Sequence, residues 1–341
     1  MKQFQENVPL LPYTTFKMGG PARFFMDIAS EEELVWALGE AEARNLRIVI
    51  LGSGSNVIIK DNEVNALVLH IVIPGFSVTS ENNDEATIRM GAGEIWDQCV
   101  ARTVAMGLSG IEALSGIPGT AGATPIQNVG AYGQEVKNVI VSVRALDRTT
   151  RQFTELSNKE CAFAYRDSMF KHGGKNRYIV TAVTFKLSHE KPSIPDYPGV
   201  TDYFAQQNIT EPALAQIRDA IIAIRKTKLP DPRDIPSAGS FFKNPIVPET
   251  QATTLKQQFP TMPQYPAKPG FIKFAAGWLI EQIGFKGKSF GTIAVYQNNA
   301  LVLTNTGKAT FQELQAAAQE IKNAVHDRFA IWLEQEPDVI G

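Results

Sequence analysis

Three short segments of the sequence contain the side chains best suited to chemistry, and the first reads YRDSMFK (165–171). Arg166 and Asp167 stand there between apolar residues. A guanidinium in such surroundings is a fixed, planar cation that suits a carboxylate or a developing oxyanion. The residues alone favour a structural Arg–Asp ion pair as strongly as they favour this functional interpretation.

The second segment, SAGSFFKNP (237–245), presents the hydroxyl of Ser240 after a small, flexible pair and before two aromatic residues. Such a hydroxyl would be partly dry and rigidly supported. The segment lacks the G-x-S-x-G pattern of a hydrolase nucleophile. Taken by itself, it favours a plainer interpretation, a serine that caps a turn.

The third segment, WLEQEP (332–337), contains Glu334 and Glu336. We expect a strand that includes 330–333 and continues through this segment. Because side chains alternate between the two faces of a strand, both carboxylates would lie on the same face. Two carboxylates on one face are either solvated, which is the usual case, or one of them works as an acid.

A fourth region has few reactive side chains and much glycine. The run SGIPGTAGATPIQNVGAYG (115–133) has no charged residue and follows neither helical nor strand periodicity. Glycine lets the main chain turn sharply and approach a ligand, and free N–H groups can hold an anion. The run therefore indicates a loop against a large cofactor that carries a phosphate; the alternative is an ordinary surface loop.

A second glycine-rich loop, GSGSN (52–56), follows a predicted strand. The dinucleotide-binding fingerprint fails because position 57 is Val and a strand follows where a helix should open. A Walker A loop fails at 287–289, because Gln282 stands where its first glycine should be. What remains is a turn between strands whose N–H groups, with the hydroxyls of Ser53 and Ser55, suit a pyrophosphate. A plain hairpin turn is the alternative.

Composition limits the class of protein. The chain has 341 residues, 44% hydrophobic and 20% charged, with a net charge of −2, so we expect two or three globular domains and no nucleic-acid surface. Two cysteines and four widely separated histidines predict neither a disulfide framework nor a metal site. We find no signal peptide or spanning segment, and we expect a soluble, cytoplasmic protein.

Local patterns predict the elements that position these segments. Capping boxes begin helices at Ser30 and Thr310, and Thr210 caps a further helix that Pro230 stops. A proline-rich stretch at 189–203 indicates a linker or surface loop. The other predicted helices lie at 93–106, 249–258 and 275–283, and strands at 48–51, 57–61, 66–73, 139–146 and 178–187, with a hairpin at 293–304.

Seven segments together resemble one family, UDP-N-acetylenolpyruvoylglucosamine reductase of peptidoglycan synthesis. They are LGSGSN (51–56), GAGE (91–94), GIPGTAGATPIQNVGAYG (116–133), YRDSMFK, TKLPDP (227–232), AGSFFKNP (238–245) and WLEQEP. They follow the family's order over nearly the whole chain, and the length and the segment around Tyr197 are similar to the longer type with a tyrosine loop. The resemblance implies an α+β fold, with a vanillyl-alcohol-oxidase (PCMH-type) FAD-binding domain of two α+β lobes and an α+β substrate-binding domain.

The resemblance also implies domain boundaries. We expect FAD-binding lobes at 1–75 and 76–195, a substrate-binding domain at 196–329, and a C-terminal strand at 330–341 that returns to the active site.

The resemblance implies a reaction in which NADPH reduces FAD, and hydride then passes from flavin N5 to the enolpyruvyl methylene of a UDP-sugar. Ser240 matches the proton donor, and Arg166 and Glu336 match the pair that stabilises the carboxylate and the enolate. A preplaced arginine stabilises charge that builds in the transition state. Glu336 can help only when it is protonated or hydrogen-bonded, since a bare anion repels an enolate.

The remaining site residues are also carried over from the resemblance. Those expected to bind FAD are Gly52, Ser53, Gly54, Ser55, Asn56, Gly116, Ile117, Pro118, Gly119, Gly122, Gln127, Asn128, Gly130, Ala131, Tyr132 and Gly133. Those expected to bind substrate are Tyr165, Tyr197, Arg225, Lys228, Asn244, Tyr265, Lys273 and Asn299. Arg225 and Lys228 suit the UDP pyrophosphate, and Tyr197 would close over it from a mobile loop.

The expected partners are UDP-N-acetylglucosamine enolpyruvate and NADPH, with no metal, nucleic acid or membrane, and we expect a monomer. Two alternatives stay open. One is another FAD oxidoreductase of the same fold, and the SFFKNP and WLEQEP segments argue against it. The other is a flavin-free sugar-nucleotide binder, and the presence of Arg166, Ser240 and Glu336 argues against that.

Overall fold

The computed structural model describes residues 3–341, which form two compact units. The first unit contains the chain up to Asn7, Arg23–Ser53 and Asn65–Lys226. The second contains Val8–Ala22, Gly54–Val64 and Thr227–Gly341. The chain therefore enters the second unit three times. The GSGSN loop contains one of these boundaries, between Ser53 and Gly54.

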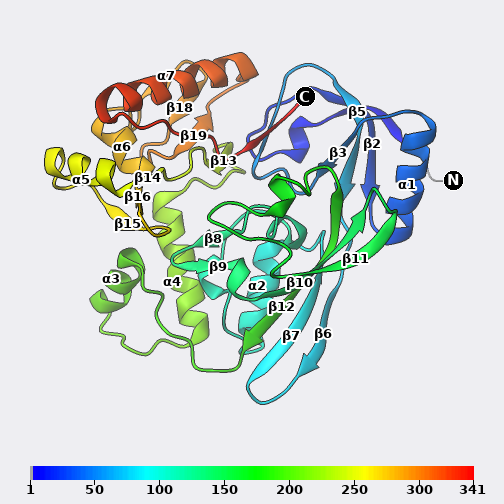
Figure 1. Ribbon diagram of the computed structural model, residues 1–341, viewed down its shortest axis with the longest axis horizontal. Helices are drawn as coiled ribbons and strands as arrows, with labels where there is room; N and C mark the ends of the chain where they lie inside the picture. Colours follow the sequence, from blue (N-terminus) through cyan, green and yellow to red (C-terminus); the bar gives the residue numbers. More distant parts are fainter. Residues whose placement is uncertain (1–2) are drawn as a thin grey trace. The chain divides into compact units, whose positions relative to one another are not determined.

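Two sheets form the framework of the first unit (Figure 1). The four-stranded sheet has the order β1-β2-β5-β3, and the five-stranded sheet has the order β11-β10-β12-β7-β6. The strands of the first are β1 Gln5–Pro9, β2 Pro21–Ile28, β3 Ile48–Leu51 and β5 Val64–Ile71. Those of the second are β6 Phe76–Glu81, β7 Glu85–Gly91, β10 Ile140–Asp147, β11 Gln152–Ser157 and β12 Tyr178–Ser188. Neighbours in the five-stranded sheet are antiparallel, whereas β3 and β5 are parallel.

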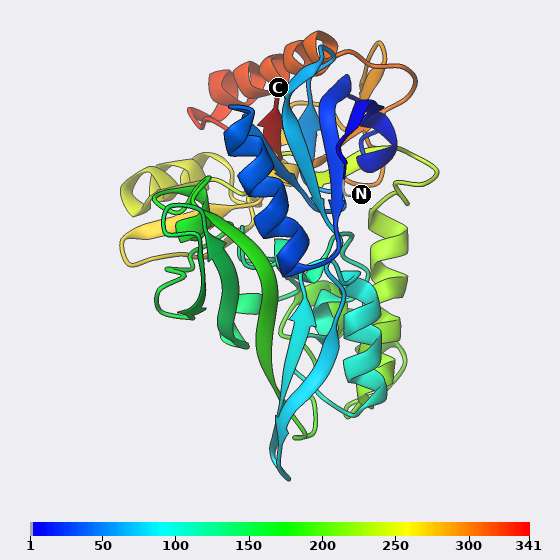
Figure 2. The same ribbon diagram turned by 90° about the vertical axis from the view of Figure 1, so that its right-hand side faces the viewer.

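The helices of this unit are α1 Glu31–Ala43, α2 Trp96–Ala105, α3 Pro198–Gln206 and α4 Leu214–Lys228. The first two bury apolar faces in the core of the sheets, and the last two pack together in a separate cluster. Figure 2 shows α1 along one face of the four-stranded sheet, and there it buries Leu34, Ala37 and Ala41. The same view shows β6 and β7 extending as a two-stranded ribbon beyond the rest of their sheet. The glycine-rich run contains two short elements, η3 Ala121–Ala123 and β8 Gly130–Ala131. It is preceded by η2 Glu112–Leu114 and followed by β9 Gln134–Glu135 and η4 Val136–Asn138.

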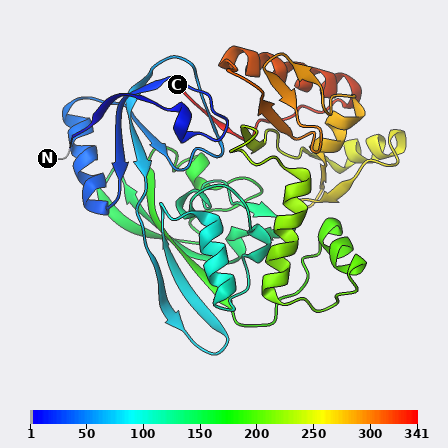
Figure 3. The same ribbon diagram turned by 180° about the vertical axis from the view of Figure 1, so that it is seen from behind.

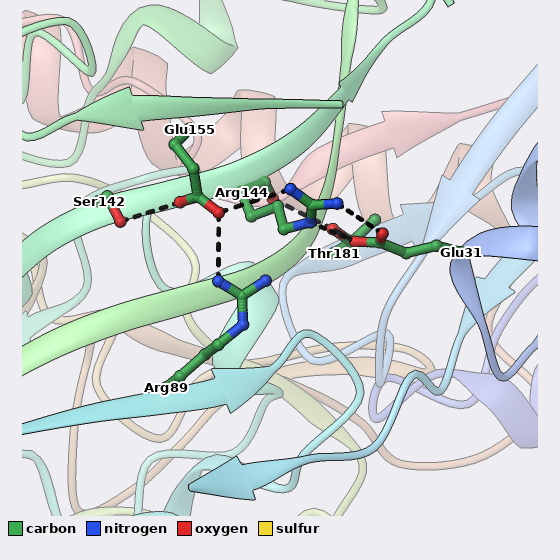
Figure 4. Close-up of polar contacts among 6 residues, drawn as sticks. All are labelled: Glu31, Arg89, Ser142, Arg144, Glu155 and Thr181. Carbon is green, nitrogen blue, oxygen red and sulfur yellow. Dashed lines mark hydrogen bonds and ion pairs between the residues drawn. The ribbon is translucent and has the colours of Figure 1, made fainter. Parts of the chain in front are cut away.

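A polar network joins α1 to the five-stranded sheet (Figure 4). Arg144 on β10 donates from Nε and from one terminal nitrogen to the two Glu31 carboxylate oxygens, at 2.7 and 2.9 Å. Thr181 Oγ1 donates to the same carboxylate at 2.7 Å, and Glu155 accepts from Arg89 at 3.1 Å. These side chains join α1, which packs on the four-stranded sheet, to the strands of the five-stranded sheet.

The second unit packs helices against small sheets. Its four-stranded sheet, β13-β19-β18-β17, carries α7 on one side (Figure 1), and the other sheets are β14-β16-β15 and β20-β4. The strands are β4 Val57–Ile59, β13 Ser237–Ser240, β14 Ile246–Pro248, β15 Gln264–Pro266, β16 Phe271–Phe274, β17 Ser289–Phe290, β18 Ile293–Val295, β19 Val302–Asn305 and β20 Asp338–Ile340. The helices are α5 Glu249–Gln258, α6 Ala276–Gln282 and α7 Phe311–Phe329.

Segments far apart in the sequence supply the core of this second unit. Phe16 and Ile58, from its first two segments, are buried in one cluster with Phe241, Phe274 and Phe329. The parallel pair β20–β4 aligns Asp338 with Val57, so the end of the chain closes the same unit. Apolar burial therefore holds three separate pieces of chain together.

Several predicted elements are confirmed. The strand at 48–51 and the helix at 249–258 have the predicted bounds. The predicted capping box at Thr310 forms with both of its hydrogen bonds. Ser30 caps α1 by accepting from the Glu33 amide, but the Glu33 carboxylate accepts from the Ala29 amide, so the reciprocal bond of a capping box is missing there. The predicted apolar face of α4 is buried at Leu214, Ile217, Ile221 and Ile224.

Three local predictions are wrong in whole or in part. The loop predicted at 189–203 is correct only for 189–197, which contain no helix or strand, because α3 begins at Pro198 and packs in a cluster with α4. Thr210 does not cap α4, which begins at Leu214, after Pro212. The strand predicted at 330–333 is absent: Ala330 is the left-handed cap of α7, and 331–337 contain only an isolated bridge, at Gln335, before β20 begins.

The part of the chain that the structure describes contains no helix long and apolar enough to cross a membrane. Within those same residues no three His, Cys, Asp or Glu side chains are grouped as metal ligands. Cys99 and Cys161 are buried free thiols, and burial raises the pKa of each to about 12.

Candidate active site

The two glycine-rich loops meet in the first unit. A Cβ atom on Gly52 would lie 3.2 Å from Oγ1 of Thr120, so the turn after β3 lies beside the run 115–133. The amide of Ala121 donates to the Glu94 carbonyl at 2.8 Å, which fixes the run against the GAGE segment. Three of the sequence motifs are therefore in contact.

Glycine is needed in these loops for two different physical reasons, backbone conformation and lack of space for a side chain. Gly133 has φ of +84°, a left-handed conformation that disfavours side chains, and a Cβ there would meet no atom closer than 3.7 Å. At Gly122, by contrast, a Cβ would lie 2.5 Å from the side chain of Ala92. At Gly54 it would lie 1.9 Å from the carbonyl oxygen of Tyr13. Gly122 and Gly54 are thus required by packing of the chain itself.

Three residues of this region adopt left-handed backbone conformations without being glycine. Their φ angles are +47° at Asn128, +49° at Tyr132 and +52° at Arg166. Such conformations are uncommon outside glycine and cluster at functional sites. Hydrogen bonds hold Asn128 in place, because its side-chain amide donates to the Ala164 carbonyl at 2.8 Å and to Glu135 at 3.0 Å.

Arg166 lies at the tip of a tight turn. Ala164 and Asp167 exchange both backbone hydrogen bonds, at 3.0 and 3.2 Å, and leave Tyr165 and Arg166 between them. A Cβ on Gly130 would lie 3.4 Å from the Arg166 guanidinium, so this cation lies against the glycine-rich run. Asp167 contacts His172 at 2.6 Å.

Arg225 and Tyr197 contact the ends of the glycine-rich run. Arg225, half-buried on α4, donates from Nε to the Gly116 carbonyl at 3.2 Å. Desolvation lowers the pKa of Arg225, although a hydrogen bond to Tyr132 acts in the other direction. Tyr197 packs edge-on against Tyr132, with 5.2 Å between ring centroids. Tyr197 lies at the end of the irregular stretch 189–197, as the N-cap of α3, so the expected loop is present up to this residue.

Ser240 ends β13 in the second unit. A bulge between Ser237 and Ser240 and a left-handed Gly239, with φ of +70°, set its direction, and Ser240 faces Val302 of β19. The interpretation as a turn-capping serine is therefore wrong. Its hydroxyl makes no hydrogen bond to any other residue within 3–341.

Glu336 lies in a segment that contacts Phe241 and Phe242, the two residues after Ser240 in the sequence. The Glu336 amide donates to the Phe241 carbonyl at 2.9 Å, and Phe242 bridges to Gln335. Glu336 is 8% exposed, whereas the Glu334 side chain is 72% exposed and pairs with Lys243 at 2.5 Å. The expected shared face of the two carboxylates fails, because no regular strand keeps the alternation past Leu333.

Four expected substrate residues gather around the start of α6 in the second unit. Asn244 accepts a hydrogen bond from the Ala276 amide at 2.9 Å, and thereby caps this helix. Tyr265 and Lys273 are cross-strand partners on β15 and β16, just before it. The Asn299 side-chain oxygen would lie 3.9 Å from a Cβ on the second residue of α6. The expected substrate residue Lys228 is exposed at the end of α4.

Two charged residues of this region were not selected from the sequence. Asp97 on α2 and Arg218 on α4 form a double hydrogen bond at 2.7 and 2.9 Å, and Asp97 also accepts from the Gly116 amide at 2.6 Å. An acid in the first turn of a helix is ordinary. The sequence alone gives no signal that this one contacts the loop.

These residues fit a large anionic cofactor. The first unit presents an uncharged, largely buried loop with left-handed backbone, next to the hydroxyls of Thr120 and Ser53. Backbone dipoles and hydroxyls of this kind hold phosphates without a cation.

Comparison with known proteins agrees with this fit. Residues 22–154 match the FAD binding domain family, and residues 231–340 match the C-terminal domain of UDP-N-acetylenolpyruvoylglucosamine reductase. The crystal structure of UDP-N-acetylenolpyruvylglucosamine reductase from Thermus caldophilus superposes with a TM-score of 0.70 at 24% identity, over 100% of both chains. Fold and FAD-domain match together define the class, a flavoprotein with a PCMH-type FAD-binding domain of two α+β lobes and an α+β substrate domain, as predicted.

Full-length relatives narrow this class. The chain is 46% identical over 340 residues to UDP-N-acetylenolpyruvoylglucosamine reductase of Cupriavidus pinatubonensis, with 100% of both chains covered. It is 41% identical to the enzyme of the same name from Pseudomonas putida, with 99% of each covered. The chain belongs to the UDP-N-acetylenolpyruvoylglucosamine reductase family.

Proposed function

We propose that this protein uses NADPH and bound FAD to reduce UDP-N-acetylglucosamine enolpyruvate to UDP-N-acetylmuramate, a step of peptidoglycan precursor synthesis in the cytoplasm. When bound, FAD supplies hydride transfer. We further propose that the loops 52–56 and 116–133 hold FAD. The buried free thiols of Cys99 and Cys161 agree with a reducing compartment.

The observation that carries this proposal is the setting of Ser240. Its hydroxyl makes no hydrogen bond within 3–341 and lies at a bulge that fixes its direction. The carbonyl of the next residue, Phe241, accepts from the Glu336 amide. Ser240 is only partly buried, so water can satisfy this hydroxyl until a substrate takes its place. Ser240 therefore suits a transient task, the donation of a proton to the substrate carbon.

The three expected catalytic residues have complementary tasks. Ser240 would protonate the carbon that carries the carboxylate. Arg166, held in a strained left-handed turn, would stabilise the growing negative charge with a preoriented guanidinium. Buried Glu336 would hold a hydrogen bond at the same carboxylate, a task that requires a proton or a donor between the two anions.

The expected substrate residues are proposed to bind the UDP-sugar. Asn244, Tyr265, Lys273 and Asn299 share the region at the start of α6, where an amide, a phenol and an ammonium offer donors to phosphate and sugar oxygens. Lys228, exposed at the end of α4, would add a cation for the pyrophosphate.

The replacement Ser240→Ala tests the proposal through its two half-reactions. Anaerobic NADPH should bleach the bound flavin of the variant as fast as that of the wild type. Recolouring by the enolpyruvyl UDP-sugar should slow by about 10²-fold or more, the usual contribution of a positioned acid. Ser289→Ala is the matched control, since Ser289 is an exposed strand serine of the same unit.

Other outcomes would contradict this proposal in different ways. Equal slowing of both half-reactions would make Ser240 only structural. If NADPH bleached the flavin of the wild-type protein but the enolpyruvyl UDP-sugar did not recolour it, the protein would be another oxidoreductase of this fold. A colourless wild-type protein that binds no added FAD would indicate a flavin-free binder.

A further inference from the structure

The main chain of Gly116 is gripped at both of its polar groups by side chains. Asp97 of α2 accepts a hydrogen bond from the Gly116 amide at 2.6 Å. Arg225 of α4 donates to the Gly116 carbonyl at 3.2 Å. Gly116 has φ of +70°, so a conformation that few residues adopt is held at the first glycine of the run.

A second arginine of α4 orients Asp97. Figure 3 shows α2 and α4 side by side, and Arg218 spans them with two hydrogen bonds to the Asp97 carboxylate, at 2.7 and 2.9 Å. The Arg218 side chain is only 15% exposed. Burial raises the pKa of Asp97, but hydrogen bonds from Arg218 and Gly116 outweigh it and hold that pKa below its ordinary value. The carboxylate is thus kept charged and aimed at the loop.

The same helix also contacts the other end of the run. Arg225 hydrogen-bonds to Tyr132, which lies sixteen residues after Gly116 and has φ of +49°. Tyr132 in turn packs against Tyr197. One face of α4 therefore supports both ends of the loop that is proposed to hold FAD.

We propose that Asp97 and Arg218 are positioning residues for FAD: they touch no reacting atom, and they preset the backbone of Gly116 and the residues after it for the cofactor. This inference rests on the proposed function. Its physical content is preorganisation. A loop that adopts its binding conformation for only a fraction of the time binds its ligand more weakly by that fraction.

The replacement Asp97→Asn separates the two contacts of this carboxylate. An asparagine oxygen can still accept from the Gly116 amide, but its NH₂ group would face a guanidinium nitrogen of Arg218, and two donors repel. The charge that aligns the group is lost at almost unchanged volume. The loop should then populate other conformations.

Asp147 offers a closely matched control in the same unit. Its carboxylate also accepts several hydrogen bonds from one arginine, Arg177, and one from a backbone amide, that of Thr149 at 2.9 Å. It is 5% exposed, and it contacts neither glycine-rich loop through these bonds. Asp147→Asn should therefore affect the stability of the protein in the same way and leave cofactor binding unchanged.

The test measures the affinity of FAD for the flavin-stripped full-length protein, by quenching of FAD fluorescence, together with thermal unfolding of the same samples. We expect Asp97→Asn to weaken FAD binding by about tenfold, the order expected for one charge-assisted contact. Asp147→Asn should keep the wild-type affinity. Hydrogen exchange at the Gly116 amide should accelerate in Asp97→Asn alone.

A second variant keeps the inference testable if Asp97→Asn folds poorly. Arg218→Lys retains the cation but cannot make the two parallel bonds, so FAD affinity should fall by less than in Arg218→Gln. Wild-type affinity in the Asp97 and Arg218 variants would overturn the inference while leaving the proposed function intact. A wild-type protein that binds no FAD would overturn both, and the two results are distinguishable.

Discussion

The Glu31–Arg144 pair is expected to contribute measurably to stability, and Glu31→Gln is the perturbation that tests it (Figure 4). Glutamine keeps the shape of Glu31 and removes the charge that binds the Arg144 fork. The two side chains are 27% and 28% exposed, so solvent screens their interaction only in part. Hydrogen bonds to charged groups contribute about 1.5–3 kcal/mol when well made, whereas fully exposed pairs contribute under about 1 kcal/mol.

The structure places the expected loss between these limits. Thr181 would still donate to the glutamine oxygen, and Arg144 would keep its contact with Glu155 at 3.7 Å. We therefore expect the free energy of unfolding to fall by about 1.5 kcal/mol. For a folding unit of 150–250 residues this corresponds to a decrease in Tm of about 3–6 °C.

A double-mutant cycle with Arg144→Met isolates the pair, since Glu31 also lies in the first turn of α1 and interacts with the helix dipole. Urea unfolding of the four proteins, followed by circular dichroism, gives the coupling energy. Glu40→Gln is the control on the same helix, because its pair with Arg44 is 37% and 51% exposed and should contribute under about 0.5 kcal/mol. A coupling for Glu31–Arg144 no larger than this control would refute the reasoning.

The pair should also depend on pH in one direction. The hydrogen bond from Arg144 is the main cause that lowers the pKa of Glu31 in the folded protein. A carboxyl with a lowered folded pKa stabilises the protein fully above its unfolded value, about 4.3, and loses that contribution as pH falls through the folded value. The difference in stability between wild type and Glu31→Gln should therefore be complete near neutral pH and shrink in acid.

Two glycines provide further predictions of opposite sign. Gly122→Ala should destabilise the protein by about 1–3 kcal/mol in urea unfolding, because its Cβ would lie 2.5 Å from the Ala92 side chain and 2.8 Å from the Ala92 backbone. Unchanged stability of Gly122→Ala would contradict this prediction and would mean that the glycine-rich run can move to make room for the methyl group. Gly39→Ala, in the interior of α1, should stabilise by about 0.5–1 kcal/mol, because its Cβ would meet no atom within 4 Å and alanine is the better helix former. A destabilised Gly39→Ala would contradict the open space described there.

Elements with strong local signals are predicted well from the sequence. The capping residues Ser30 and Thr310 fix two helix starts through bonds to amides three residues away, and that information is local. By contrast, α3 forms in a proline-rich stretch because Val200 and Phe204 are buried against Ile217 and Ile221 of α4. Such a tertiary contact overrides the local pattern.

The candidate site shows the same limit. The sequence indicates which loops are rich in glycine, but it does not reveal that Gly122 is required by Ala92, thirty residues earlier in the chain. Nor does it reveal the bulge that directs Ser240, or the breakdown of alternation that buries Glu336 and exposes Glu334. Each of these depends on a strand or segment that is distant in sequence.

The pairing of β20 with β4 has a consequence for biosynthesis. Ile340 pairs with Ile59, and the core around Phe16 also needs Phe329, so the second unit is assembled from segments that leave the ribosome at very different times. Contacts of such long sequence separation form slowly. Until they do, Phe16 and Ile58 remain uncovered, and this interval is when a nascent chain most needs protection from aggregation.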